Sequence, residues 1–307
     1  MTKRREHSKS ERGQMLAVVA VSAVALIAMG AFAMDVGAWI RTHRATQSVA
    51  DASALAGAQA LPVKSSDATE LAGSYSGKNG GGLTEIRFES RTFPQDTIFI
   101  GAERTSPGFL SRVLGIASVS VKADAAARAY NMGSAKYVGP FAVWEGHPYV
   151  RGSAACPCLG DNFVTTIELD SGRPSLGAFK IINVDGSRGG LGQSTLSDWI
   201  LKGLDAYMGP GWYYSDPGAK YNPDQIEDAV EARIGSEILV PVYRSVREQG
   251  AGYEYDVIGW IAFHILAFTK RGANGALTGY FTSAPWEGIP TESAKNYFGA
   301  KVIKLIG

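Results

Sequence analysis

MLAVVAVSAVALIAMGAFAM, residues 15–34, contains one weakly polar side chain, that of Ser22, and no charged one. A helix rises about 1.5 Å per residue, so this stretch would extend roughly 30 Å, which is the thickness of the hydrocarbon core of a bilayer. A helix also satisfies its own backbone hydrogen bonds, as a segment surrounded by lipid must. The stretch therefore predicts one membrane-spanning helix.

The charges on either side of this stretch predict its orientation. Residues 1–14 carry more cations than anions, namely Lys3, Arg4, Arg5, Lys9 and Arg12 against Glu6 and Glu11. On the other side, Asp35 follows the stretch directly. Because basic residues are retained on the cytoplasmic side, residues 1–14 are predicted to form a cytoplasmic segment. The protein would then be a single-pass protein of the cytoplasmic membrane, with the bulk of its chain in the periplasm or outside the cell.

A cleavable signal peptide is the alternative interpretation of the same features. A basic start, an apolar core and the small residues Ala31 and Ala33 fit one. The apolar stretch is, however, longer than the 7–15 residues usual for such a core, and the helical pattern continues beyond it. A retained anchor is preferred, and a secreted or surface-exposed adhesin or binding module, released after Ala33, is the alternative function.

Composition excludes some classes of protein. The 307 residues suffice for one large or two modest domains with a sizeable core. A net charge of +1 gives no electrostatic basis for binding nucleic acid. The 37 glycines favour many turns and short strands. Together with the long helix, these features predict an α+β protein.

The helix is predicted to continue beyond the membrane, so that residues 15–61 form one element that is closed by Pro62. Small residues recur along this extension at intervals of four, at Ala50, Ala54 and Ala58 and again at Ser53 and Gly57. Such residues make a flat face that another helix can approach closely. The face could pack against the folded part of the same chain or against a partner helix, and both interpretations remain open at this point.

Three short motifs along this helix resemble a known family. Arg12-Gly13-Gln14 opens the apolar stretch, Asp35-Val36-Gly37 follows it, and Ala50–Ala58 reads ADASALAGA. In order and spacing they resemble the N-terminal segment of TadE/TadG-like proteins, which assemble the tight-adherence (Flp) pilus. The resemblance does not extend to cleavage after Gly13, because the glutamate usual five residues later is replaced by Val18.

The resemblance carries expectations about function. It implies a membrane-embedded, pilin-like helix in a minor pilin or assembly factor. The implied partners are the lipid bilayer and other pilin-like or pilus-assembly proteins. We expect helix packing and assembly to depend on Asp35, Ala50, Ala54, Gly57 and Ala58.

Residues 62–132 are predicted to form a small α/β unit. Apolar residues at helical spacing alternate along it with short runs of β-forming residues. The expected elements are a helix at 66–76, strands at 84–90 and 97–101, a short helix at 107–115 and a third strand at 116–130. A strand–helix–strand arrangement beside a long helix is also what the resemblance implies.

Residues 133–307 are predicted to form a β-rich extracytoplasmic domain. The expected elements before residue 236 are strands at 163–169 and 178–184 and helices at 195–208 and 222–235. Near the C-terminus, three apolar and β-branched stretches predict an antiparallel meander at 237–246, 253–269 and 276–282. Blocks such as Val240–Tyr243 and Val257–Phe263 resemble the outer domain of TadE/TadG-like proteins, and the resemblance implies no catalytic residues in them.

No constellation of residues predicts catalysis, a cofactor or a metal site. The chain has no HExxH motif and no pair of histidines at ligand spacing. His264 lies in an apolar strand and is interpreted as a core or sheet histidine. The least favoured hypothesis is an extracytoplasmic hydrolase. It would require a cleft that holds His147 or His264 within hydrogen-bond reach of a nucleophile or a carboxylate.

Three further features are candidate sites. The loop Asp185–Gly189 resembles the metal-ion-dependent adhesion site of von Willebrand A domains, but Gly189 replaces the last serine, and a glycine-rich turn is preferred. Cys156 and Cys158 are predicted to pair in a disulfide that closes a tight loop, or else to form an intermolecular link. Asp35 either marks the outer membrane–water boundary or pairs with a cation on a neighbouring helix.

Overall fold

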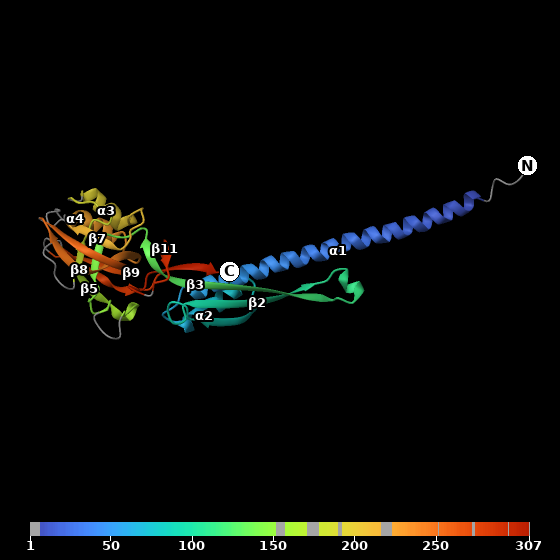
Figure 1. Cartoon of the computed structure of the whole chain (residues 1–307), viewed down its shortest axis with the longest axis horizontal. Coiled ribbons are helices and arrows are strands. Elements are labelled where there is room, and N and C mark those ends of the chain that lie inside the picture. The colour runs from blue at the N-terminus through green and yellow to red at the C-terminus, as the bar shows by residue number, and fades with distance from the viewer. Residues whose placement is uncertain are drawn as a thin grey trace, which may run out of the picture.

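A computed structural model of the chain describes residues 7–151, 157–170, 178–189, 192–215, 223–250, 252–271, 274–293 and 295–306. The molecule is elongated, with one long helix, α1 (His7–Ala58), leading to two β-sheets (Figure 1). The N-terminus lies at the free end of α1, and the larger sheet forms a head at the opposite end of the molecule. This arrangement confirms the predicted α+β fold class.

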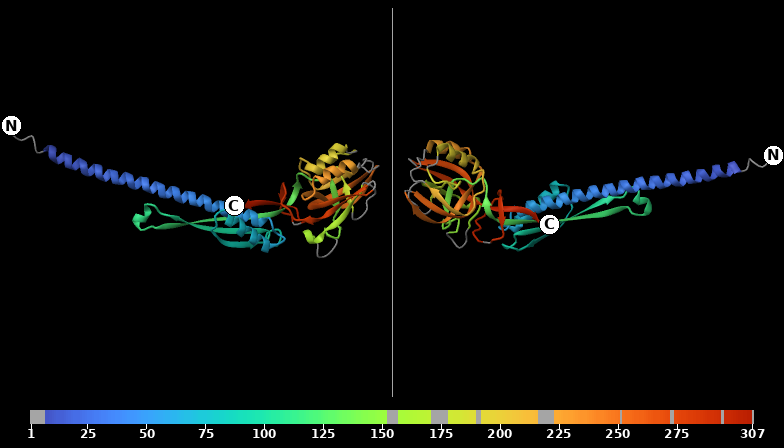
Figure 2. Two further views of the ribbon diagram at one scale, coloured as in Figure 1. Left: turned by 180° about the vertical axis from the view of Figure 1, so that it is seen from behind. Right: turned by 45° about the horizontal axis from the view of Figure 1, so that its top comes forward.

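α1 is one continuous helix of 52 residues. Its segment Gln14–Ala58 is long and apolar enough to cross a membrane. The N-terminal half of α1 projects away from the folded part of the chain in every view (Figure 2). The predicted helix and its continuation beyond the apolar stretch are both confirmed.

The smaller sheet packs against the C-terminal half of α1. Its order is β1-β2-β3-β11, with β12 also paired to β3, and the neighbouring strands are antiparallel. The strands are β1 (Leu83–Glu89), β2 (Thr97–Pro107), β3 (Ser118–Ala135), β11 (Gly288–Thr291) and β12 (Lys301–Ile306). A short helix, α2 (Ser65–Lys78), packs beside α1. Alanines from the helices and β-branched or small residues from the sheet form the shared core.

The β2–β3 hairpin is longer than the sequence predicts. β2 extends to Pro107 and pairs with β3 along its whole length, down to the pair Pro107↔Ser118. Its second half, AERTSP, is polar and carries no alternating pattern, which is why the expected strand ended at residue 101. The helix expected at 107–115 is only the single turn η1 (Ser111–Leu114), which ends at Gly115 with φ +87°.

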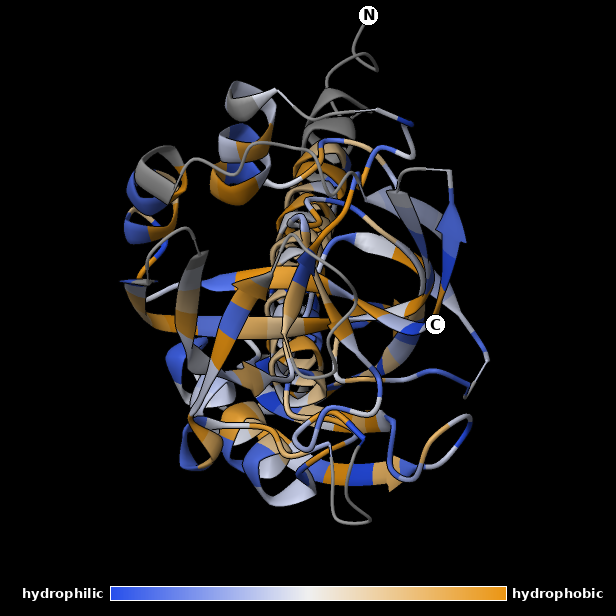
Figure 3. Cartoon of the chain, turned by 90° about the vertical axis from the view of Figure 1, so that its left-hand side faces the viewer, coloured by the Kyte–Doolittle hydropathy of each residue, from blue (hydrophilic) through white to orange (hydrophobic). Residues whose placement is uncertain are grey.

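The strands of the larger sheet close on themselves. The pairing order is β10-β5-β6-β4-β8-β9, and β9 pairs in turn with β10. β7 also pairs with β9, along the part of β9 that β10 does not reach. The strands are β4 (Phe141–Trp144), β5 (Thr165–Asp170), β6 (Phe179–Ile181), β7 (Gly211–Ser215), β8 (Glu237–Gln249), β9 (Gly252–Arg271) and β10 (Asn274–Thr282). Phe141, Phe179, Phe263 and Phe281 are buried together inside this ring. Figure 3 views the head along the long axis, with the hydrophobic residues of α1 behind it.

The predicted antiparallel meander is confirmed, because β8 pairs with β9 and β9 with β10, both antiparallel. The helix expected at 195–208 is shorter: α3 (Gln193–Lys202) ends before Gly203, whose φ of +74° stops it. Leu204 and Met208 form isolated bridges to Val138 and Ala135 instead of helical turns. α4 (Pro223–Glu231) begins at the predicted proline, and its expected cap, Asn222, lies outside the described residues.

The end of the chain returns to the smaller sheet. β11 and β12 both pair with β3, so strands from the last 20 residues complete a sheet begun near residue 83. The sequence did not predict either strand. The domain boundaries at residues 61/62 and 132/133 remain predictions, and a sheet with strands from both sides of residue 132 joins the two regions.

Lys301 connects this returning strand to the end of α1. Its side chain is buried, and its ammonium Nζ donates hydrogen bonds to the carbonyl oxygens of Gln59 at 2.5 Å and Leu61 at 2.6 Å. Burial lowers the pKa of Lys301 to about 7. The unfolded chain therefore holds this proton at a pH where the folded chain has released it.

We expect this shift to make the folded state more stable as the pH rises from about 7 to about 10. Between the folded and unfolded pKa values the unfolded state binds more protons, so stability rises with pH, by at most roughly 1.4 kcal/mol per pH unit. Urea titrations at several pH values would measure this slope in the wild type and in Lys301→Met. The slope should disappear in Lys301→Met and persist in Lys304→Met, which alters an exposed lysine of the same strand. Equal slopes in all three proteins would contradict the assignment.

Candidate functional site

α1 has two halves with opposite surroundings. Along residues 14–34, all of which the structure describes, every residue is exposed except Ala31. The exposed side chains are large and apolar, among them Leu16, Leu26, Ile27 and Phe32. A soluble protein does not expose an apolar surface of this extent without a partner or a membrane to cover it. The exposed half is therefore the surface of α1 that is available to lipid or to another helix.

One face of the other half is covered by the chain itself. The predicted packing residues lie there and are all buried: Ala50, Ala54, Gly57 and Ala58. They face α2, β2 and β3 in one hydrophobic core that also contains Val49 and Leu61. A Cβ atom at Gly57 would lie 2.5 Å from Cδ1 of Ile98 and 3.0 Å from the carbonyl oxygen of Ala68. The sequence left open whether this face packs against the same chain or against a partner helix. In the structure it packs against the same chain.

Asp35 lies between the two halves and is 1% exposed. Its carboxylate accepts hydrogen bonds from three consecutive backbone N–H groups, those of Phe109 at 2.7 Å, Leu110 at 3.1 Å and Ser111 at 2.7 Å. These groups belong to the tip of the β2–β3 hairpin. Asp35 therefore fixes the hairpin tip to the first turn of α1 beyond the apolar stretch. Whether Asp35 also takes part in assembly, as predicted, stays a prediction.

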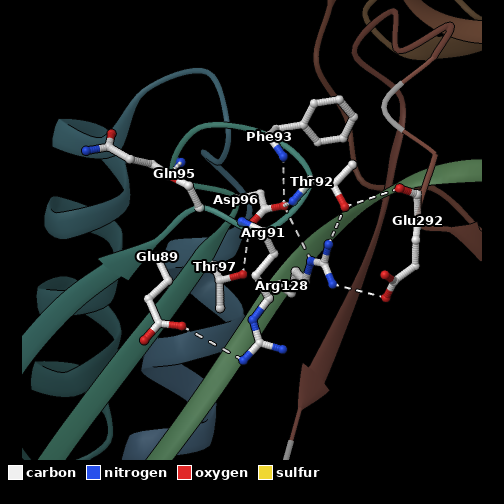
Figure 4. Close-up of polar contacts among 10 residues, drawn as sticks. Glu89, Arg91, Thr92, Phe93, Gln95, Asp96, Thr97, Arg128 and Glu292 are labelled. Carbon is white, nitrogen blue, oxygen red and sulfur yellow. Dashed lines mark hydrogen bonds and ion pairs between the residues drawn. The ribbon is translucent and has the colours of Figure 1, made fainter.

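A second buried carboxylate, that of Asp96, organises the turn between β1 and β2. It accepts hydrogen bonds from the backbone N–H of Arg91 at 3.1 Å, Thr92 at 2.7 Å and Phe93 at 3.0 Å (Figure 4). The hydroxyl of Thr97 donates another, at 2.8 Å. Burial raises the pKa of Asp96, but the N–H groups of Phe93 and Thr92 outweigh it and leave the pKa below its ordinary value.

Arg128 extends this cluster to the C-terminal part of the chain. Its guanidinium lies 3.4 Å from the Asp96 carboxylate and 3.2 Å from that of Glu292, and it also donates to the hydroxyl of Thr92 (Figure 4). The Arg128 side chain is buried, whereas Glu292 is largely exposed. Next to it, the amide of Asn131 donates to the carbonyl oxygens of Ser293 and Lys295. These contacts fasten the returning C-terminal segment to the smaller sheet.

The Asp185–Gly189 loop is held by hydrogen bonds of its own. The N–H of Ser187 donates to the Asp185 carboxylate at 2.9 Å, and the amide of Asn183 donates to the carbonyl oxygens of Ser187 and Gly189. Gly186 and Gly189 both have positive φ. These features are those of a glycine-rich turn. Within the described residues, no three His, Cys, Asp or Glu side chains are grouped so that they could hold a metal ion.

The two candidate histidines lie in different settings. His147 is buried between the rings of Tyr149 and Phe281, and burial lowers its pKa. His264 faces Glu237 on the neighbouring strand, with 3.0 Å between Nδ1 and the carboxylate, and its ring stacks on Tyr280. Residues opposite one another on adjacent strands normally pair in this way, so His264 is placed as a sheet histidine.

The predicted cysteine pair is described only in part. Cys158 is disulfide-bonded, and Cys156 lies outside the described residues. The N–H of Cys158 also donates to the carbonyl oxygen of Tyr149, which ties this loop to the head.

Sequence reasoning missed the residues that join distant parts of the chain. Asp96, Arg128 and Lys301 were not singled out, and neither was the hairpin tip. Aspartate in a turn usually accepts from the backbone two residues ahead, but Asp96 accepts from residues three to five positions behind it, so that motif did not mark it. Arg128 and Lys301 stand in β-strands, where nothing local marks a charged side chain as buried.

Comparison with known proteins gives one match. Residues 13–60 match the family model described as "Putative Flp pilus-assembly TadE/G-like". No curated protein and no solved structure was found to match the chain. The matched residues are the exposed apolar stretch, Asp35 and the covered small-residue face. The resemblance seen in the sequence is thus confirmed over α1. It supports a role in pilus assembly and suggests a structural function that does not involve catalysis.

Proposed function

We propose that the chain is a membrane-anchored structural component or assembly factor of a tight-adherence (Flp) pilus, similar to a minor pilin. The observation that carries the proposal is the division of α1 into an exposed apolar half and a half built into the chain's own core. The first half suits lipid or the helices of other pilin-like proteins. The second half makes the smaller sheet a direct extension of the anchor.

The proposed topology follows from the charges around the apolar stretch. The basic residues of segment 1–14 would remain in the cytoplasm, and the two sheets would lie in the periplasm or outside the cell. In this arrangement the protein acts by packing its helix and by displaying the head. Its proposed partners are the bilayer and other pilus-assembly proteins.

The proposal is tested by deleting the gene and restoring it with chosen variants. Wild-type protein should restore surface pili and fractionate with the membrane or the fibre. In the double variant Val21→Arg/Ala25→Arg, two charges at the centre of the span should cost about 5–7 kcal/mol on insertion scales and abolish both properties. The matched control, Val21→Leu/Ala25→Leu, should behave as the wild type. Normal piliation in the deletion strain would refute the proposed role.

N-terminal sequencing of the mature protein tests the anchor separately. The proposal expects residues 15–34 to be present in the protein isolated from cells. A mature protein that begins at or near Met34 would instead identify a released adhesin or binding module.

A further inference from the structure

The tip of the β2–β3 hairpin, residues 108–117, carries exposed apolar side chains that no part of the described chain covers. Phe109 is 80% exposed, Ile116 46% and Leu110 36%. Arg112 is exposed beside them. The arms of the hairpin differ, because their exposed side chains are polar, as with Thr105, Ser118, Ser120 and Lys122. The apolar surface is therefore confined to the tip.

The position of the tip along α1 is fixed. The Asp35 carboxylate accepts hydrogen bonds from the N–H groups of Phe109, Leu110 and Ser111. Asp35 is the first residue after the apolar stretch. One turn earlier on the same helix face, Ala31 is the buried residue of an otherwise exposed stretch. Figure 1 shows the hairpin running beside α1 toward its N-terminal half. The tip thus lies where the membrane-spanning part of the helix would leave the bilayer.

We infer that this tip enters the headgroup region of the outer face of the same membrane, as a second contact beside the helix. The inference rests on the proposed anchoring of α1. Exposed Phe and Leu side chains next to an arginine are the composition of segments that lie about 5–10 Å into the boundary between headgroups and acyl chains. The guanidinium of Arg112 suits anionic phosphates there, while its stem adds to the apolar surface.

Asp35 has a defined part in this contact. A carboxylate at the edge of a bilayer would normally have to remain hydrated. Here three N–H groups of the tip take the place of water around the Asp35 carboxylate. The same hydrogen bonds satisfy three backbone donors that would otherwise enter the interface unpaired. The hydrogen bonds that hold the tip therefore also lower the cost of placing it against lipid.

Nitroxide labels on single added cysteines test the depth of the tip. The full chain, carrying Phe109→Cys, would be reconstituted in vesicles of phosphatidylcholine and phosphatidylglycerol. Collision rates with dissolved oxygen, which concentrates in lipid, would be compared with those of a water-soluble nickel chelate. The unsubstituted protein records any labelling of Cys156 or Cys158. We expect the label at residue 109 to give a severalfold higher oxygen-to-nickel ratio than one at Thr105→Cys, an exposed position four residues earlier, in β2.

A third label, at Leu26→Cys, separates this inference from the proposed anchoring. If Leu26 is protected from nickel while Phe109 is as accessible as Thr105, the helix spans the membrane and the inference about the tip is overturned. If neither Leu26 nor Phe109 is protected, the anchor itself fails. Protection of Phe109 that vanishes on dilution of protein into more lipid would show that a second copy, and not the bilayer, covers the tip, and would also overturn the inference.

Discussion

Asp96→Ala is expected to lower the free energy of unfolding of the folded part by about 3–5 kcal/mol, the range for removing one member of a buried charged pair. The substitution leaves the partly buried N–H groups of Arg91, Thr92 and Phe93 without their acceptor. It also leaves the guanidinium of Arg128 without its buried partner. Urea titration of the full chain in detergent micelles, followed by tryptophan fluorescence, measures the change. A loss below about 1 kcal/mol, typical of exposed pairs, would contradict the burial of this cluster.

Two comparisons sharpen this result. Asp67→Ala removes an aspartate from the exposed pair with Lys64 and should lower the free energy of unfolding by no more than about 0.5 kcal/mol.

The second comparison is between unfolding free energies measured at different pH values. The pKa of Asp96 is lowered in the folded state, so its contribution is fully present above the unfolded value of about 4 and is lost as the pH falls through the folded value. The difference in the free energy of unfolding between wild type and Asp96→Ala should therefore become smaller below about pH 4.

Gly57→Leu should have the second largest effect, a loss of about 3 kcal/mol, toward the upper end of the range for overpacking a core. Even the Cβ atom meets Ile98 and the backbone oxygen of Ala68, and backbone cannot move aside as a side chain can. We expect α2 and the smaller sheet to separate from α1 while the apolar half still enters membranes. Hydrogen exchange of the α2 amides and membrane fractionation would report the two effects independently.

Gly37→Leu is the matched control, because it makes the same change on the same helix where no atom lies within 4 Å of the added Cβ. Replacing an exposed helical glycine with leucine should stabilise the helix by up to about 1 kcal/mol. If both variants were tolerated equally, the covered face would not be packed as described, and a partner helix would be the better interpretation of the small residues.

The parts of the fold that sequence predicts well are those with long, regular patterns. The apolar stretch at 15–34 is uniformly apolar over the length of a membrane span, and the strands β8, β9 and β10 are rich in apolar, β-branched and aromatic residues, so their type follows from local chemistry. The second half of β2 was missed because the residues on its buried face, Ala102 and Ser106, are small or polar and give no apolar alternation. Strand β12 was missed because its partner, β3, lies about 170 residues earlier in the chain.

The candidate site was predictable in composition but not in pairing. Ala50, Ala54 and Ala58 fit a close approach by any neighbour, and spacing alone cannot distinguish an intramolecular neighbour from a partner. Asp35 was recognised as unusual, yet its partners are backbone N–H groups more than 70 residues away. Backbone donors belong to every residue and leave no mark in a sequence, so only the fold could identify them.

The unbroken course of α1 from its exposed apolar half into the core of the smaller sheet has a mechanical consequence for the proposed anchor. The helix contains no proline between His7 and Ala58 and therefore offers no obvious hinge. Membrane helices tilt by about 20°, and over the roughly 35 Å of α1 beyond Asp35 such a tilt would sweep its far end through about 12 Å. In the proposed anchored state α1 would act as a lever arm, and a neighbour that tilts it within the bilayer would also move the smaller sheet that packs on it.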